Sequence, residues 1–468
     1  MQIPVLSGVY TDNGPDFRRS YPVNLVPVAL PNGISNGYVR PADGFASVGT
    51  GPGIDRGGIE RDGFHYRVMG TKLVQVYPDN SIVQLGDVGG TGPVTMDYSF
   101  TLLAIASGGN LFYYNPATNV LTQVTDPDLG TVIDMCWVDG YFMTTDGQYL
   151  IVTELSDPFA VNPLKYGSSE ADPDPVVALI KLRNEVYALN RHTIEVFDNV
   201  GGDLFPFARI EGAQIQKGCV GTHACCQFAE AIAFVGNGRN EAPSVYLGVN
   251  GNAQKIATRE IDALLEGYTE AQLAAIECES RIGKGLQQLL IHLPDKTLAY
   301  DIVASQAVGE PVWFILSGAL FGYGQYRARH LTYVNDNWYV GDVSTAALGV
   351  MDDKIGTHFG SEVGWELGTT IIYNESRGAI VNALELVALT GRVDVGDNPT
   401  ISAAYSLDGI TWSMERYIPA GNIGDRTKRL CWFRCGILRN WRIQRFRGTS
   451  SARLSFARLE AQLEPLAF

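Results

Sequence analysis

The sequence lacks the features of a membrane protein, of a disulfide-rich secreted domain and of the common metalloproteases and P-loop enzymes. It contains no apolar run long enough to span a bilayer, and its first residues do not form a secretory signal. The seven cysteines are an odd number scattered along 468 residues, which does not fit a disulfide framework. His-Glu-x-x-His and Gly-Lys-Ser motifs are missing. We therefore expect a protein that is not an enzyme, needs no cofactor and is assembled in a reducing cytoplasm.

Charged residues are also scarce, at 18% of the chain, and they are unevenly placed. The net charge is −15, yet residues 426–458 contain ten Lys or Arg and no Asp or Glu, so the remainder carries −25. On average that remainder repels nucleic acid, whereas the basic segment is suited to an acidic surface.

Short strands joined by tight turns are abundant. The chain has 52 Gly, 22 Tyr and 19 Phe and is 46% hydrophobic, which is typical of β-proteins. From residue 63 a pattern of apolar strand, turn and apolar strand repeats, and its first turns, at Gly70, Gly108, Asp146 and Asn190, lie 38, 38 and 44 residues apart. Propeller blades repeat about every 40 to 50 residues. Later copies occupy residues 232–247, 289–300 and 338–340.

This period predicts an all-β chain with a β-propeller of six or seven blades over residues 56–355. Only two strong strands are visible in each repeat, so the weaker runs between them must supply the other two strands of each blade. A β-sandwich with coincidental spacing is the alternative.

The two ends of the chain have strand patterns that differ from those of the repeats. Residues 1–55 contain few strand runs, and we expect an extended N-terminal arm that lies on the same subunit or on a neighbour. Residues 356–468 contain longer alternating strands, including residues 381–387, 401–406 and 441–446. They predict a C-terminal antiparallel β-sandwich or jelly-roll-like domain.

One helical pattern, at residues 258–277, interrupts the strands. Ile261, Leu264 and Leu265 fall at i, i+3 and i+4, and Gly267 follows where a left-handed C-cap belongs.

A second short helix is expected directly afterwards, because Thr269 and Gln272 form a capping-box pattern. The resulting helical hairpin is longer than a blade connection needs, so we expect it to contact another subunit or a partner protein, or else to cap an open end of the propeller. The candidate interaction residues are Ile261, Leu264, Leu265 and Tyr268.

Cys219, His223, Cys225 and Cys226 form the densest set of potential metal ligands. On a strand the first three share one face, but Cys226 points away from Cys225. A closed zinc site needs four converging ligands, so we expect no metal. Residues 406–412 resemble a sialidase Asp-box that is one residue short, a motif that is structural even in enzymes.

Aromatic and basic residues alternate at residues 441–447, as they do in proteins that bind single-stranded nucleic acid. Strand alternation places Arg442 and Gln444 on one side and Arg445 on the other, which also fits an ordinary half-exposed sheet. We expect Arg442, Arg445 and Arg447 to be interaction residues that face acidic protein neighbours.

Several short stretches in the first three quarters of the chain match a known family in their residues and in their order along the chain. They are residues 216–218 with 221–222, 242–246, 268–269 with Leu273, and 290–294 with 300–301, and more weakly 22–24, 37–40 and 66–68. In these stretches the chain resembles the packaged-DNA stabilisation proteins of short-tailed phages (podoviruses). Proteins of this family form the tail hub or nozzle below the portal.

The resemblance implies a structural virion protein of the phage tail, assembled in the host cytoplasm. Its copies would form a homo-oligomeric ring, hexameric in this family, below the portal and the head-tail adaptor ring. The ring would extend the DNA channel, help to retain packaged double-stranded DNA and pass it on ejection without sequence-specific binding. Further implied partners are the tail needle or plug and the tail spike or fibre proteins. Two other classes stay open: a carbohydrate-binding or glycan-cleaving propeller for host recognition, and a nucleic-acid-binding module.

Overall fold

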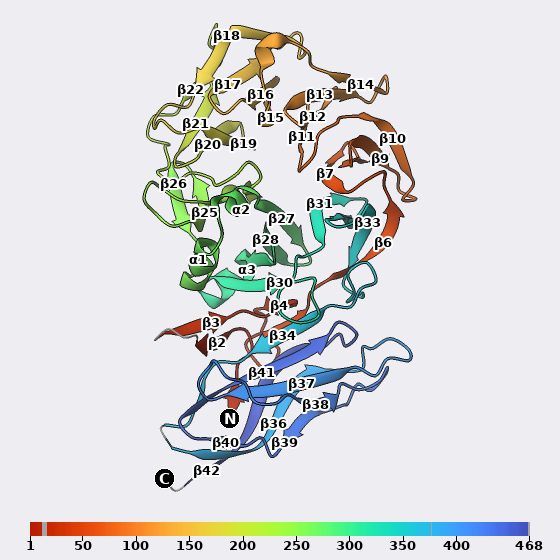
Figure 1. Ribbon diagram of the computed structural model, residues 1–468, viewed down its shortest axis with the longest axis vertical. Coiled ribbons are helices and arrows are strands. Elements are labelled where there is room, and N and C mark those ends of the chain that lie inside the picture. The colour runs from red at the N-terminus through yellow and green to blue at the C-terminus, as the bar shows by residue number, and fades with distance from the viewer. Residues whose placement is uncertain (12–15, 376, 467–468) are drawn as a thin grey trace. The chain divides into compact units, whose positions relative to one another are not determined.

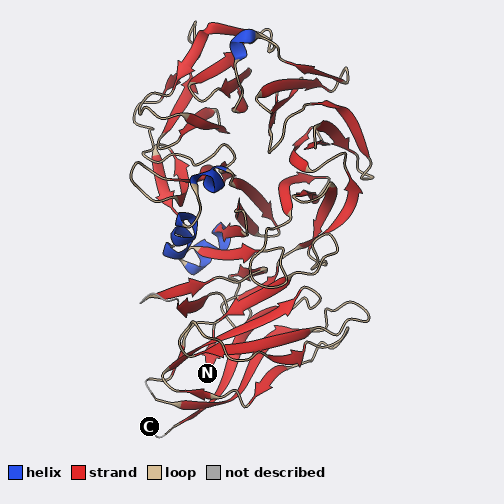
Figure 2. Cartoon of the chain, in the orientation of Figure 1, coloured by secondary structure: helices blue, strands red, loops and turns tan. Residues whose placement is uncertain are grey.

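The structure is a computed structural model that describes residues 1–11, 16–375 and 377–466 (Figure 1). Most of its regular structure is β-sheet, with three short α-helices and one 3-10 turn among these residues (Figure 2). None of the helices in the described part of the chain is long and apolar enough to cross a membrane.

Internal contacts divide the chain into two units, each discontinuous in sequence. We call residues 47–294 and 327–350 the propeller unit, and residues 1–46, 295–326 and 351–468 the sandwich unit. The predicted domain boundaries rest on sequence texture and stay a prediction; the predicted arm includes residues 12–15, which lie outside the described residues.

Seven four-stranded sheets are present in the described residues. The first four consist of β7 (Asp55–Arg61), β8 (Phe64–Met69), β9 (Lys72–Val76) and β10 (Ile82–Asp87); β11 (Thr95–Tyr98), β12 (Leu103–Ser107), β13 (Asn110–Asn115) and β14 (Val120–Gln123); β15 (Asp134–Val138), β16 (Tyr141–Thr145), β17 (Tyr149–Thr153) and β18 (Val161–Ser168); and β19 (Val176–Leu182), β20 (Glu185–Asn190), β21 (Ile194–Asn199) and β22 (Phe207–Arg209). The last three consist of β23 (Cys225–Phe228), β24 (Ala231–Gly236), β25 (Ser244–Val249) and β26 (Asn252–Lys255); β27 (Glu277–Gly283), β28 (Leu286–His292), β29 (Thr297–Asp301) and β30 (Val312–Leu316); and β31 (Ala328–Val334), β32 (Asn337–Asp342) and β33 (Ala347–Asp352) with β6 (Gly44–Thr50).

The inner strands of these sheets form a closed ring inside the propeller unit. Each of β7, β11, β15, β19, β23, β27 and β31 contacts the next, and β31 contacts β7. Figure 1 shows the sheets of the unit arranged around a common centre. The predicted propeller is confirmed, with seven blades in the described residues.

The strong hairpins of the sequence are the two middle strands of each blade. In the first blade, β8 and β9 are almost entirely buried, whereas the outer strand β10 is exposed or half-buried. Outer strands such as β14 have the same exposed character. Middle strands therefore have continuous apolar runs, whereas outer strands have fewer apolar residues and are harder to recognise in the sequence.

Besides β29 and β30, which belong to the sheet of the sixth blade, the sandwich unit contains two packed sheets. The larger has the order β39 (Leu430–Phe433), β36 (Ala379–Leu389), β42 (Ser455–Pro465), β5 (Tyr38–Pro41) and β4 (Leu25–Val28), with β1 (Gln2–Ile3) on β42 and β40 (Ile437–Leu438) on β36. The smaller has the order β34 (Gly364–Gly368), β41 (Trp441–Thr449), β37 (Thr400–Ser406) and β38 (Arg416–Pro419), with β35 (Ile372–Tyr373) on β41. Trp432 and Phe446 meet between the sheets with ring centroids 5.2 Å apart, and Trp365 meets Phe456 at 4.9 Å. The predicted sandwich is confirmed.

The N-terminal residues supply strands to this sandwich. β1 pairs with the C-terminal strand β42 through Gln2 and Ile3, and β4 pairs with β5. β2 (Gly8–Thr11) and β3 (Phe17–Ser20) form a hairpin of their own. In the described residues this stretch is therefore bound into the sheets of its own chain, one of the two placements that the sequence left open.

The helical hairpin is present as α1 (Arg259–Glu266) and α2 (Glu270–Ala274), and the Thr269–Gln272 capping box is formed. The predicted left-handed cap at Gly267 is wrong, because this residue has φ −75° and stays right-handed. The amide of Gly267 binds the carbonyl of Leu264 at 3.2 Å, so the last turn tightens and runs directly into the next N-cap.

One helix was missed, α3 (Ile302–Val308). Asp301 caps it by accepting the N–H of Ala304 at 3.0 Å, and Gly309 ends it in the left-handed conformation with φ 83°. Its β-branched start, Ile302 and Val303, resembles a strand in sequence.

The two helix-ending glycines give a matched pair of substitutions. Gly309→Ala should lower the free energy of unfolding by about 1 kcal/mol or more, because alanine is strained at a left-handed position. Gly267→Ala should change it by less than about 1 kcal/mol, since its backbone suits any residue. Urea denaturation of both variants checks this, and equal losses would contradict the assigned conformations.

Candidate functional site

Acidic side chains on the inner strands of the propeller unit bind backbone N–H groups of the neighbouring blade. Asp97 on β11 accepts the N–H of Trp137 on β15 at 2.6 Å. Asp134 on β15 accepts the N–H of Leu179 on β19 at 2.8 Å. Each of these carboxyl groups therefore joins its blade to the next one through a main-chain hydrogen bond.

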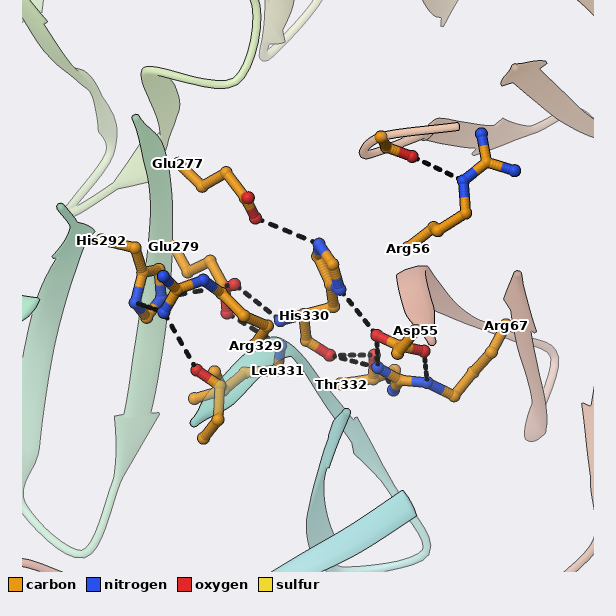
Figure 3. A network of polar contacts seen from close by, with 12 residues as sticks. Asp55, Arg56, Arg67, Glu277, Glu279, His292, Arg329, His330, Leu331 and Thr332 are labelled. Atoms are coloured by element: carbon orange, nitrogen blue, oxygen red, sulfur yellow. Dashed lines mark hydrogen bonds and ion pairs between the residues drawn. The ribbon is translucent and has the colours of Figure 1, made fainter. Parts of the chain in front are cut away.

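A group of charged side chains lies where β31 meets β7, at the junction of the first and last blades (Figure 3). Asp55 on β7 binds Arg67 on β8 through two hydrogen bonds of 2.7 and 2.6 Å. Nδ1 of His330 on β31 lies 2.6 Å from the same carboxylate. Arg67 also donates to the main-chain carbonyl of His330 at 2.9 Å. One carboxylate thus holds three strands together.

The other side of His330 faces β27. Its Nε2 lies 3.1 Å from Glu277, while its own N–H and that of Leu331 donate to Glu279 at 2.7 and 2.8 Å. Nε2 of His292 lies 3.4 Å from Glu279. We call Asp55, Arg67, Glu277, Glu279 and His330 the closure network.

Burial and charge pairing act in opposite directions on this network. Burial lowers the pKa of His330, but Asp55 and Glu277 raise it overall to about 10. Burial raises the pKa of Glu279, but His292 and His330 lower it overall to about 2. His330 is therefore an imidazolium held between carboxylates at neutral pH.

Perturbed pKa values often mark catalytic groups, but the groups of the closure network bind one another and the main chain. Removing one member would leave an uncompensated buried charge, which typically costs about 3 to 5 kcal/mol. The arrangement is suited to fixing the junction of the first and last blades.

The structure divides the predicted helical interaction residues into two pairs. Ile261 and Leu265 are buried, and α1 packs against β25 of the same unit. Leu264 and Tyr268 are half-buried. The first pair therefore anchors the hairpin to its own propeller, and only the second pair retains surface for another molecule.

The three predicted arginines on β41 also differ from one another. Arg442 is 1% exposed, donates to Gln444 at 2.8 Å and lies over the ring of Tyr405 at 4.0 Å. Arg442 and Gln444 share the side of the strand that faces the sandwich interior, and both are buried.

Arg445 and Arg447 lie on the other side of the strand and are half-buried. Arg447 pairs with Glu366 at 2.6 Å and with Glu415 at 3.1 Å. Arg445 stacks on Trp412 at 4.1 Å. The two carboxylates therefore neutralise the charge of Arg447.

The proposed face shared by Cys219, His223 and Cys225 does not form, because β23 begins only at Cys225. The described residues contain no group of three or more His, Cys, Asp or Glu side chains able to hold a metal ion. Their seven cysteines are all free.

Two short motifs have structural roles. In the Asp-box-like turn, Asp408 accepts the N–H groups of Ile410 and Thr411 at 2.8 and 2.7 Å. Residues 33–37 spell Gly-x-Ser-x-Gly, but Ser35 lies in the loop between β4 and β5 and its hydroxyl donates to the carbonyl of Gly37. A nucleophile elbow needs a strand-to-helix turn, so Ser35 does not have the position of a catalytic nucleophile.

Sequence reasoning missed the closure network. Its available signal was a charge inside an apolar middle strand, since Arg67 stands between Tyr66 and Val68 and is fully buried. Such a residue requires a buried partner, but the sequence does not say that the partners come from β7 and β31.

The closure network predicts a pH dependence of stability. Because the folded pKa of His330 is raised from 6.5 to about 10, its stabilisation is full below about pH 6.5 and is lost as pH rises toward 10. His330→Gln should reduce the fall in unfolding free energy between pH 7 and 10.

Asp134 supplies a control in another pH window. Burial raises its pKa from 3.8 to about 7 despite its hydrogen bonds from Leu179 and Thr95, so it favours folding below pH 4 and loses that effect as pH rises through 7. Asp134→Asn should alter the slope between pH 4 and 7 only. Denaturation across pH measures both variants, and an unchanged slope above pH 7 in His330→Gln would contradict the assigned imidazolium.

Comparisons with known proteins agree with this architecture. A family model described as "Bacteriophage P22 Gp10, beta-propeller" matches residues 1–356, and one described as "Bacteriophage P22 Gp10, beta-sandwich" matches residues 364–464. The tail hub protein gp10 of Salmonella phage P22 is 29% identical over 465 residues, which cover 94% of each chain.

Two solved structures show only distant likeness. The Pan2 WD40 domain of Neurospora crassa has a TM-score of 0.43 at 10% identity, covering 68% of this chain and 97% of that one. The N-terminal domain of Nup159 has a TM-score of 0.42 at 8% identity, covering 66% and 95%. The family matches span both units and confirm the resemblance seen in the sequence: the chain belongs to the Bacteriophage P22 Gp10 family.

Proposed function

We propose that this chain is a structural tail hub protein of a phage. The observation that carries the proposal is the relation to the P22 tail hub protein gp10 over 94% of both chains, which includes propeller and sandwich alike. A likeness limited to the propeller would be compatible with many activities, because this fold serves many functions.

The polar groups of the propeller fit a scaffold rather than an enzyme. Asp97, Asp134 and Glu279 accept backbone N–H groups of neighbouring blades. Such bonds rigidify the unit and leave these carboxylates committed to structure. A rigid unit suits a protein that must hold its shape while DNA passes.

In the proposed assembly, copies form a ring, hexameric in line with the family, between the head-tail adaptor and the needle or plug. Spike or fibre proteins would be further neighbours. Assembly would take place in the host cytoplasm, and the protein would then stay in the virion as part of the tail. Large apolar side chains at the surface are candidates for these contacts, including Phe100 at 90%, Val395 at 86% and Leu164 at 71% exposure.

The charges favour a passive DNA conduit over a nucleic-acid-binding module. Each free cation on a channel wall would add a salt-dependent phosphate contact, but Arg447 is paired with two carboxylates. With a net charge of −15, copies around a channel repel the duplex from its walls. We propose an acidic lumen with Arg442, Arg445 and Arg447 away from DNA. No described contact favours the glycan-binding alternative.

Labelling tests the location directly. An epitope inserted in the exposed turn at Lys284 and Gly285 should leave the propeller folded, since Gly285 has open space around it. Electron micrographs of antibody-labelled virions should then show label at the tail below the portal, with unlabelled virions as the control. Label on the capsid shell, or tagged folded protein absent from particles, would contradict the tail hub proposal.

The helical hairpin gives a surface test of assembly. Leu264→Gln should lower incorporation into tails by about tenfold while leaving thermal unfolding nearly unchanged, because Leu264 is only half-buried and a central apolar contact is typically worth more than about 1 kcal/mol. Ala263→Gln, at an exposed neighbour on the same helix, is the matched control. Leu265 is unsuitable because it is fully buried. Equal incorporation of both variants would show that Leu264 of the hairpin does not contact another tail protein.

A further inference from the structure

A cavity of about 330 Å³ lies in the sandwich unit between residues of its two sheets. Leu384 and Trp432 line it from the larger sheet, and Tyr405, Arg442 and Gln444 line it from the smaller one. The volume is at the lower end of the range of small-ligand pockets, about 300 to 1,000 Å³. It suits one projecting group rather than a large molecule.

The charges of this cavity have one sign. Arg416, Arg434 and Arg442 line it together with no Asp or Glu. We call it the arginine cavity. Arg416 and Arg434 are exposed at its mouth, whereas Arg442 is 1% exposed. A positive potential therefore extends from the mouth to a recessed cation.

Arg442 has no carboxylate partner among the described residues. Its guanidinium donates to the carbonyl of Cys435 and to Gln444 at 2.8 Å, and Nε has no hydrogen-bond partner there. Arg416 likewise donates to main-chain carbonyls, those of Phe433 at 2.7 Å and Arg434 at 3.1 Å. Arg447 on the same strand as Arg442 has two carboxylates instead.

A buried guanidinium without an anion is electrostatically costly. Burial lowers the pKa of Arg442 from 12.5 to about 10, which reflects the absence of a compensating negative charge. An incoming carboxylate would find a preoriented planar donor, and arginine binds carboxylates through paired N–H groups.

We propose that the arginine cavity binds a carboxylate carried by an acidic segment of a partner protein. The depth of Arg442 favours a side chain or chain terminus that projects into the cavity over the continuous backbone of a nucleic acid. Met414, 91% exposed at the rim, offers apolar surface to the residues that flank such a carboxylate. The anion preference follows from the sandwich unit alone and does not rest on the tail hub proposal.

Binding of peptides to the full chain tests the proposal. A fluorescein-labelled hexaglutamate peptide is titrated with the protein and followed by anisotropy, with hexaglutamine as the neutral probe. Arg416→Gln combined with Arg434→Asn removes the mouth charges at exposed positions; asparagine is chosen because Arg434 has φ 53°, which asparagine tolerates. Arg392→Gln, at an exposed arginine outside the cavity, is the control for the loss of a positive charge elsewhere on the surface.

The double variant should bind hexaglutamate at least tenfold more weakly than the natural chain, whereas Arg392→Gln should stay within about twofold and hexaglutamine should not bind. Circular dichroism confirms that the variants are folded. Equal weakening by both variants, or equal binding of hexaglutamine, would overturn the proposal. Competition by inorganic phosphate at lower concentration than by free glutamate would also overturn it, because the site would then select phosphate.

Discussion

Closing the ring of blades is the constraint on which the propeller unit depends. Strands β7 and β31 are far apart in sequence, so bringing them together costs chain entropy. Asp55 meets this requirement by binding Arg67 on its own blade and His330 on the other. Buried ion pairs are weak evidence of net stability, because desolvation offsets much of their attraction. Their directional bonds instead make one register of the junction much better than its neighbours, which is what closure needs.

The closure network also restricts nearby backbone. A Cβ at Gly341 on β32 would lie 2.3 Å from the Cβ and the carboxylate carbon of Asp55. Only glycine leaves room for the carboxylate to reach His330 at this point. Elsewhere the blades adhere through apolar clusters, such as the one joining Tyr113 on β13 to Phe142 on β16 with ring centroids 4.9 Å apart. Non-directional packing and the main-chain bonds of Asp97 and Asp134 hold neighbouring blades together, and the closure network fixes the junction of the first and last blades.

The propeller and the sandwich could be predicted from the sequence because both folds are built from strands and turns that have local sequence patterns. Blade hairpins appear as apolar runs around turns such as Gly70, and the Thr269–Gln272 capping box is confirmed by its hydrogen bonds. Gly267 was misassigned because its conformation depends on where the following helix begins. The closure network was not predictable, since Asp55 and His330 are 275 residues apart. No local pattern shows which distant strand will supply a counter-charge.

Segment charge proved a poor guide to surface charge for the same reason. The ten cations of residues 426–458 suggested a basic patch, but Arg429 pairs with Glu385, Arg447 with Glu366 and Arg458 with Glu460. Glu385 and Glu366 come from distant parts of the chain and Glu460 lies just beyond the segment, so folding neutralises part of the excess. Arg442 escapes this neutralisation and is also the least exposed of the three predicted arginines. At the arginine cavity, positive charge without a carboxylate partner therefore extends from the exposed mouth into a recess, which suits a projecting anion better than a passing duplex.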